Sequence, residues 1–84
     1  MTTTKIFCIK KDQFHPNEIG ERLKSLYPSQ KKKGFKGTLY KIGEGKIMRH
    51  YYDLMEICTN NAKEIYQVRS QLEKTLNVRL VESC

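Results

Sequence analysis

The sequence contains no long apolar run. A membrane-spanning helix needs about 20 consecutive apolar residues, whereas hydrophobic residues make up 38% of this 84-residue chain and occur in short, interrupted segments. We therefore expect no membrane partner. A chain of this length is typical of one domain with one modest core, so we predict a single domain over residues 1–84.

Cysteine is scarce, with only Cys8, Cys58 and Cys84. An odd number of cysteines does not fit a disulfide framework, and their spacing is not that of a metal site. We therefore expect reduced thiols in a cytoplasmic protein, with no metal and no other cofactor. The apolar surroundings of Cys8 and Cys58 predict that both are small core residues.

Motifs for catalysis are also absent. The chain has no carboxylate pair, no strand–turn–helix nucleophile motif and no phosphate-binding glycine loop. A small ribonuclease toxin could use His50 as a base and Arg49 to stabilise negative charge, with Tyr51 beside them. Successive residues of a strand point to opposite faces, however, so these three do not all share a side. We predict no catalytic residues and no enzyme, with a ribonuclease as the third alternative.

Acidic residues are few in the middle of the chain. The net charge is +7, and residues 21–52 contain nine basic residues against only Glu21 and Glu44, so this window carries the whole excess. Such a concentration of charge indicates an anionic partner rather than a particular fold. The nine basic residues are Arg22, Lys24, Lys31, Lys32, Lys33, Lys36, Lys41, Lys46 and Arg49.

Apolar periodicity predicts two helices. The first begins at Pro16, whose missing N–H costs nothing in the first turn, and ends before Pro28. The second begins after Thr59, Asn60 or Asn61, all good N-caps, and ends at Asn77. Its apolar stripe is Ala62, Ile65, Val68, Leu72 and Leu76.

Four strands are expected around these helices. The first is short and apolar, the second and third form a hairpin, and the fourth follows the second helix; they span residues 5–10, 35–42, 47–58 and 78–81. The alternation of apolar and polar residues fails near Tyr51 and Tyr52, where we predict a bulge or bend.

The order β-α-β-β-α-β is that of the ferredoxin-like split βαβ plait, in which an antiparallel four-stranded sheet carries two helices on one face. The other face of the sheet is then open. We expect Phe7, with Tyr51 or Tyr52, to be exposed there, where RNA-recognition domains stack bases.

Basic and aromatic residues alternate between residues 31 and 52. Ammonium and guanidinium groups neutralise phosphates, and aromatic rings stack on bases. We therefore predict a small module that binds RNA or another single-stranded nucleic acid. The predicted contact residues are Lys31, Lys32, Lys33, Phe35, Lys36, Tyr40, Lys41, Lys46, Arg49 and Tyr51.

The same features fit a second class of protein. A small non-enzymatic regulator or inhibitor, such as those that phages direct against host defences, would place its basic residues on an acidic protein surface or a ribonucleoprotein. Its partner could bind the open face or pair with an edge strand at residues 35–42. A homodimer formed through the open face is a further alternative.

Overall fold

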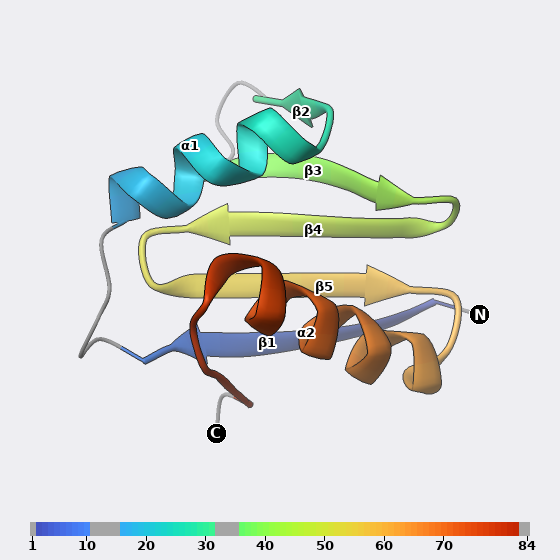
Figure 1. The fold of residues 1–84 in the computed structure, drawn as a ribbon. Coiled ribbons are helices and arrows are strands. Elements are labelled where there is room, and N and C mark those ends of the chain that lie inside the picture. Colours follow the sequence, from blue (N-terminus) through green and yellow to red (C-terminus); the bar gives the residue numbers. More distant parts are fainter. Residues whose placement is uncertain (1, 11–15, 32–35, 83–84) are drawn as a thin grey trace.

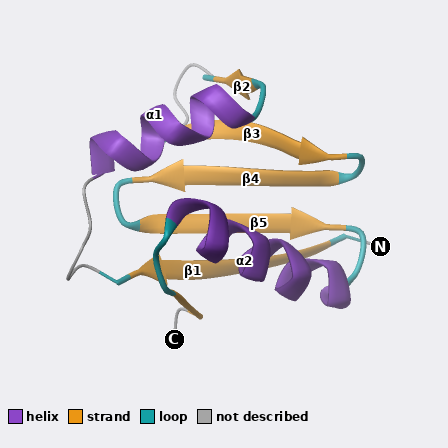
Figure 2. Cartoon of the chain, in the orientation of Figure 1, coloured by secondary structure: helices purple, strands orange, loops and turns teal. Residues whose placement is uncertain are grey.

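The protein is an α+β fold with two helices and one six-stranded antiparallel sheet (Figures 1 and 2). The computed structural model describes residues 2–10, 16–31 and 36–82. The strands lie in the order β2-β3-β4-β5-β1-β6. The elements are β1 (Thr3–Ile9), α1 (Pro16–Leu26), β2 (Ser29–Gln30), β3 (Thr38–Gly43), β4 (Lys46–Tyr51), β5 (Leu54–Thr59), α2 (Ala62–Leu76) and β6 (Leu80–Glu82).

The predicted four-stranded ferredoxin-like plait is wrong, because the segment expected as one long strand is a hairpin. Tyr51 pairs with Leu54, so Tyr52 and Asp53 form a two-residue turn between β4 and β5. A single strand over residues 47–58 would be about 40 Å long at roughly 3.3 Å per residue, longer than the 34 Å maximum extent of the molecule. The bulge lies instead in β3, where the register with β4 shifts between Lys41 and Gly43.

A further strand not predicted from the sequence covers part of β3. In β2, Ser29 pairs with Tyr40 and Gln30 pairs with Leu39. Residues 39 and 40 are therefore not at the edge of the sheet, as the idea of a partner strand pairing there required. The shortness of β2 explains why no alternating pattern marked it.

Both helices lie on the same face of the sheet, as predicted (Figure 1). For α1, the Tyr40 hydroxyl donates to the carbonyl oxygen of Gly20, at 3.4 Å. For α2, the Arg69 guanidinium lies 6.0 Å from the centroid of the Phe7 ring. The pairing registers place Tyr40 and Phe7 on one face, so the two helices share it.

The helix ends follow their predicted signals. The side chain of Asn61 caps α2 by accepting from the Glu64 N–H at 3.0 Å. Asn77 ends α2 in the left-handed conformation, with φ 55°. Within the described ranges, neither helix is long and apolar enough to cross a membrane.

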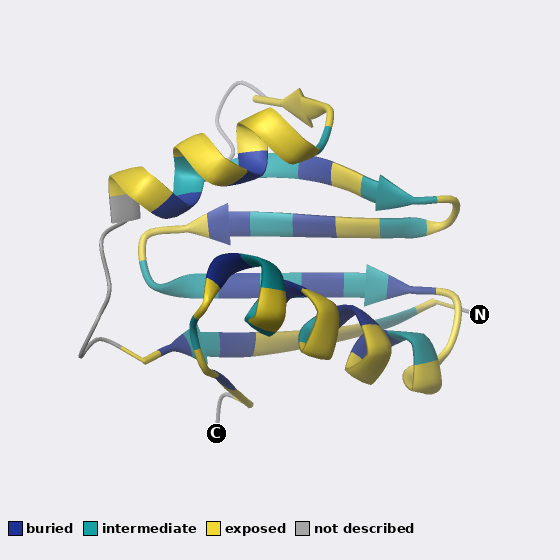
Figure 3. Cartoon of the chain, in the orientation of Figure 1, coloured by how far each residue is buried: buried dark blue, intermediate teal, exposed yellow. Residues whose placement is uncertain are grey.

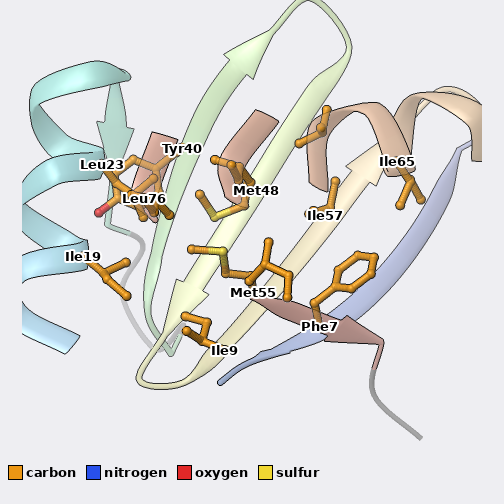
Figure 4. Close-up of a cluster of buried hydrophobic side chains, with 13 residues drawn as sticks. Phe7, Ile9, Ile19, Leu23, Tyr40, Met48, Met55, Ile57, Ile65 and Leu76 are labelled. Atoms are coloured by element: carbon orange, nitrogen blue, oxygen red, sulfur yellow. The ribbon is translucent and has the colours of Figure 1, made fainter. Parts of the chain in front are cut away.

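The core fills the space between the helices and the sheet (Figures 3 and 4). The apolar stripe of α2 is buried as predicted, apart from Ala62 at its start. The buried apolar residues are Phe7, Ile9, Ile19, Leu23, Tyr40, Met48, Met55, Ile57, Ile65, Val68, Leu72, Leu76 and Leu80.

Two aromatic residues lie on the opposite face from the one that we expected. Phe7 was predicted on the open face and Tyr40 was predicted to stack on bases, but both are buried beneath the helices, with exposed fractions of 0% and 1%. Burial raises the pKa of the Tyr40 hydroxyl, and its hydrogen bond with Thr38 opposes that rise. Tyr40 therefore joins α1 to the sheet instead of facing a ligand.

We predict that Tyr40→Ala lowers the free energy of unfolding by about 3–5 kcal/mol, because it leaves a cavity between α1 and β3. Tyr40→Phe keeps the ring and removes the hydrogen bonds of the hydroxyl with Gly20 and Thr38, so it should cost about 0.5–1.5 kcal/mol for each bond lost. Urea unfolding measures both values. Equal, small effects of the two substitutions would contradict the assignment of Tyr40 to the core.

Candidate nucleic-acid interface

The face of the sheet opposite the helices is what we call the open face. Alternation along the strands assigns to it the even-numbered residues of β1 and β5 and the odd-numbered residues of β3 and β4. No helix in the described part of the chain lies over it (Figure 1). Its residues are Thr4, Ile6, Cys8, Leu39, Lys41, Ile47, Arg49, Tyr51, Leu54, Glu56 and Cys58, with Val81 of β6 next to Cys8.

Tyr51 is the aromatic residue of the described strands that lies on the open face. Its exposed fraction is 41%. The Lys36 ammonium lies 5.8 Å from the centroid of its ring, within the range of a cation–π contact. A ring and a positive charge therefore occur side by side on this face.

Gly37 allows this arrangement. Its φ is +83°, a conformation that favours glycine. A Cβ at position 37 would collide with the carbonyl oxygen of His50 and lie 2.9 Å from the Cβ of Tyr51. The segment that carries Lys36 can thus approach β4 closely only because residue 37 has no side chain.

Arg49 holds the same segment from the centre of the open face. One guanidinium nitrogen donates to the carbonyl oxygen of Lys36 at 3.1 Å. The other lies 3.5 Å from the Glu56 carboxylate, directly across the β4–β5 pair. Much of the Arg49 charge is therefore balanced within the protein, and its position fits an anchor for Lys36 better than a free phosphate contact.

A groove of about 600 Å³ lies over β2, β3 and β4. Leu39, Lys41 and Ile47 line it from the open face, with Gln30 from the edge strand. Lys41 is exposed, and exposed Lys31 follows β2 directly. The groove thus has an apolar floor and basic groups at its margin.

Two other predicted contact residues, Tyr40 and Lys46, do not lie on this face. Lys46 shares the alternation of Met48 and His50, so it lies on the helix-covered face at the hairpin end. Tyr40 is buried, as described above. Lys32, Lys33 and Phe35 lie outside the described residues. The predicted residues that the structure places together are Lys36, Lys41, Arg49 and Tyr51.

The half of the open face that lies over β1 and β6 was not predicted from the sequence. Ile6 and Val81 are exposed there, with exposed fractions of 40% and 44%. Cys8 and Cys58 are half-buried on the open face, so the prediction that they are core residues is wrong. The alternation of β1 could have revealed this half, but both parities of β1 are apolar, which hides its direction.

His50 lies on the helix-covered face and is buried, with an exposed fraction of 8%. Its Nε2 donates to the carbonyl oxygen of Tyr52 at 2.9 Å. Burial lowers the pKa of the imidazole below its ordinary value, and this hydrogen bond opposes the shift. Arg49 and Tyr51 face the other way, so the three groups of the ribonuclease hypothesis lie on two faces.

Comparison with protein-family models, curated proteins and solved structures found no match for the chain. Among residues 2–10, 16–31 and 36–82, no three His, Cys, Asp or Glu side chains are grouped as metal ligands would be. The geometry of the open face is therefore the feature from which a function can be inferred.

We predict that His50 makes stability depend on pH. Its pKa is lower in the folded than in the unfolded protein, so the unfolded state binds more protons below about pH 6.5. Stability is complete above that pH and should fall as the pH drops toward the folded pKa, by at most about 1.4 kcal/mol per pH unit. His50→Gln, which retains an N–H donor, should lack this loss in urea unfolding at pH 5–8. His15 is common to both proteins, so identical pH profiles would contradict the prediction.

Proposed function

We propose that this protein binds single-stranded nucleic acid, most favourably RNA, across the half of the open face formed by β2, β3 and β4. The observation that carries the proposal is the exposed Tyr51 ring, with the Lys36 ammonium over it. Lys41 lies on the same face, in the neighbouring strand β3. An aromatic ring and ammonium groups on one uncovered surface are the two components that single-strand binding requires.

The arrangement favours unpaired bases. In a duplex, each base is stacked between its neighbours and is not available to a protein ring, whereas a single strand can turn its bases outward. Tyr51 would then stack on one base while Lys36 and Lys41 contact the phosphates on either side. The groove beside Leu39 and Ile47 would accept the apolar face of a neighbouring base.

Arg49 has a different role in this proposal from the one expected from the sequence. Its contacts with Glu56 and the Lys36 carbonyl hold the binding segment in position. Lys31 adds charge at the margin, and Lys32, Lys33 and Phe35 belong to the same chain segment.

A second candidate is a protein-binding regulator, favoured by the apolar half of the open face. Ile6, Ile47 and Val81 are exposed on it, and protein interfaces bury such residues. An acidic protein surface would meet the lysines, or a second copy of the chain would cover the apolar half. Nucleic-acid binding is preferred because charge and ring are in direct contact at Tyr51.

We predict that the double substitution Lys36→Gln with Lys41→Gln weakens binding to a fluorescent single-stranded RNA by about 10-fold or more in anisotropy titrations, because two phosphate contacts are lost. The matched control is Lys63→Gln with Lys74→Gln. It removes the same charge from exposed positions of α2, on the other side of the sheet. Equal weakening by both pairs would show that only net charge matters and would reject the proposed surface.

Salt provides an independent measurement on the unmodified protein. If four or five phosphates are contacted, log K should fall with log salt at a slope of roughly −3. A flat salt response, or no RNA binding at low salt, would reject the nucleic-acid proposal in favour of a protein partner. Gel analysis of the same mixtures tests the ribonuclease alternative, since RNA that stays intact excludes cleavage under those conditions.

A further inference from the structure

Glu56 gives the open face a negative group near its centre. It lies in β5, directly across from Arg49 of β4 and beside Ile6 of β1, and its side chain is 31% exposed. The other open-face residues of the described strands are neutral or basic. A carboxylate repels phosphate groups, whereas the ammonium groups of Lys36 and Lys41 attract them. A bound strand would therefore keep its backbone near the lysines and turn a base toward Glu56.

The ion pair with Arg49 does not use the full hydrogen-bonding capacity of the Glu56 carboxylate. The guanidinium nitrogen lies 3.5 Å from Oε2, which is longer than the roughly 2.7–2.9 Å of a charge-assisted hydrogen bond. Within the described residues, neither carboxylate oxygen of Glu56 accepts a hydrogen bond from another side chain or from the main chain. Two acceptor oxygens on one planar group are thus available to a ligand.

Tyr51 lies next to Glu56 on the same face. Tyr51 pairs with Leu54, and Arg49 pairs with Glu56, so Tyr51 and Glu56 are diagonal neighbours across the β4–β5 pair. Such positions are about 7–8 Å apart, within reach of aromatic and long side chains. A base that stacks on the Tyr51 ring can therefore reach the Glu56 carboxylate with its edge.

We propose that Glu56 selects guanine as the base that stacks on Tyr51. The inference rests on the proposed function and names the base. Guanine has two adjacent donors, N1–H and the N2 amino group, on its Watson–Crick edge, and the two carboxylate oxygens accept such a pair. Adenine and cytosine each have a ring-nitrogen acceptor beside the amino group, and uracil has a carbonyl on both sides of N3–H. Each of these three bases would bring an acceptor against the carboxylate.

The first test varies the RNA and uses the unmodified protein. Anisotropy titrations compare an oligouridine with strands in which one central uracil is replaced by guanine, adenine or cytosine. The guanine should strengthen binding about 5- to 100-fold, as expected for a bidentate contact to a base. Inosine, which lacks the N2 amino group, should lose most of this gain. The matched control is 7-deazaguanine, which is changed on the opposite edge and should bind like guanine.

The second test varies the protein. Glu56→Gln replaces one acceptor oxygen by an amide donor, so the ratio of affinities for the guanine strand and the oligouridine should fall to about 2-fold or less. The ratio is the readout because loss of the Arg49 ion pair and the change in net charge act on both strands. Glu44→Gln is the matched control. It removes the same charge from an exposed position in the turn between β3 and β4, and it should keep the wild-type ratio.

The outcomes separate this inference from the proposed function. If the wild type binds the four strands equally, Glu56 does not select a base and the proposed function stands. A preference for another base, inosine binding as tightly as guanine, or a guanine preference that survives Glu56→Gln would also overturn the inference alone. Equal loss of the preference in Glu44→Gln would do the same, because net charge would then explain it. If the wild type binds none of these RNAs, both proposals fail.

Discussion

The packing of both helices against one face of the sheet is the constraint on which the remaining features depend. Along β4, Met48 and His50 point into the core while Ile47, Arg49 and Tyr51 point away from it. Two helices provide one layer of cover, so no helix of the described residues covers the second set. The same alternation that builds the core therefore produces an uncovered surface, and its chemistry is set by residues that the core does not select.

That separation explains how the charge of the open face is organised. Arg49 is neither buried with the apolar residues nor left in bulk water; it lies between Glu56 and the Lys36 carbonyl. Such a partly buried ion pair fixes geometry more than it adds stability. Gly37 complements it by letting the segment that carries Lys36 lie against Tyr51. Together they place one ammonium group over one ring.

Local signals were strong enough to predict the helices and the class of fold. The two prolines, Pro16 and Pro28, restrict the backbone, whereas Asn77 tolerates the left-handed conformation that ends α2. The apolar stripe of α2 is a signal of burial, and each of these signals lies within a few residues of chain. The hairpin between β4 and β5 was missed because its turn has no glycine, asparagine or proline signal. The clue was the change of the buried residues from even numbers, at Met48 and His50, to odd numbers, at Met55 and Ile57, which a tight two-residue turn requires.

The candidate site was predicted in part. Charge is a property of composition, so the basic window could be located from the sequence, and Lys36, Lys41, Arg49 and Tyr51 do share a face. The direction of each aromatic side chain depends on strand register, which the sequence left open for Phe7 and Tyr40. Register is set by pairing between distant strands, and the apolar residues on both parities of β1 could not decide it.

Among the described residues, the sheet ends in short strands at both margins, two residues in β2 and three in β6, whereas its inner strands have six or seven. Exposed strand margins are templates for intermolecular pairing, and natural proteins limit them by keeping outer strands brief. Lateral growth into fibres or extended sheets would therefore find few main-chain groups to continue from. A protein that offers a broad uncovered plane and narrow flanks can meet another molecule through side chains without polymerising through its backbone.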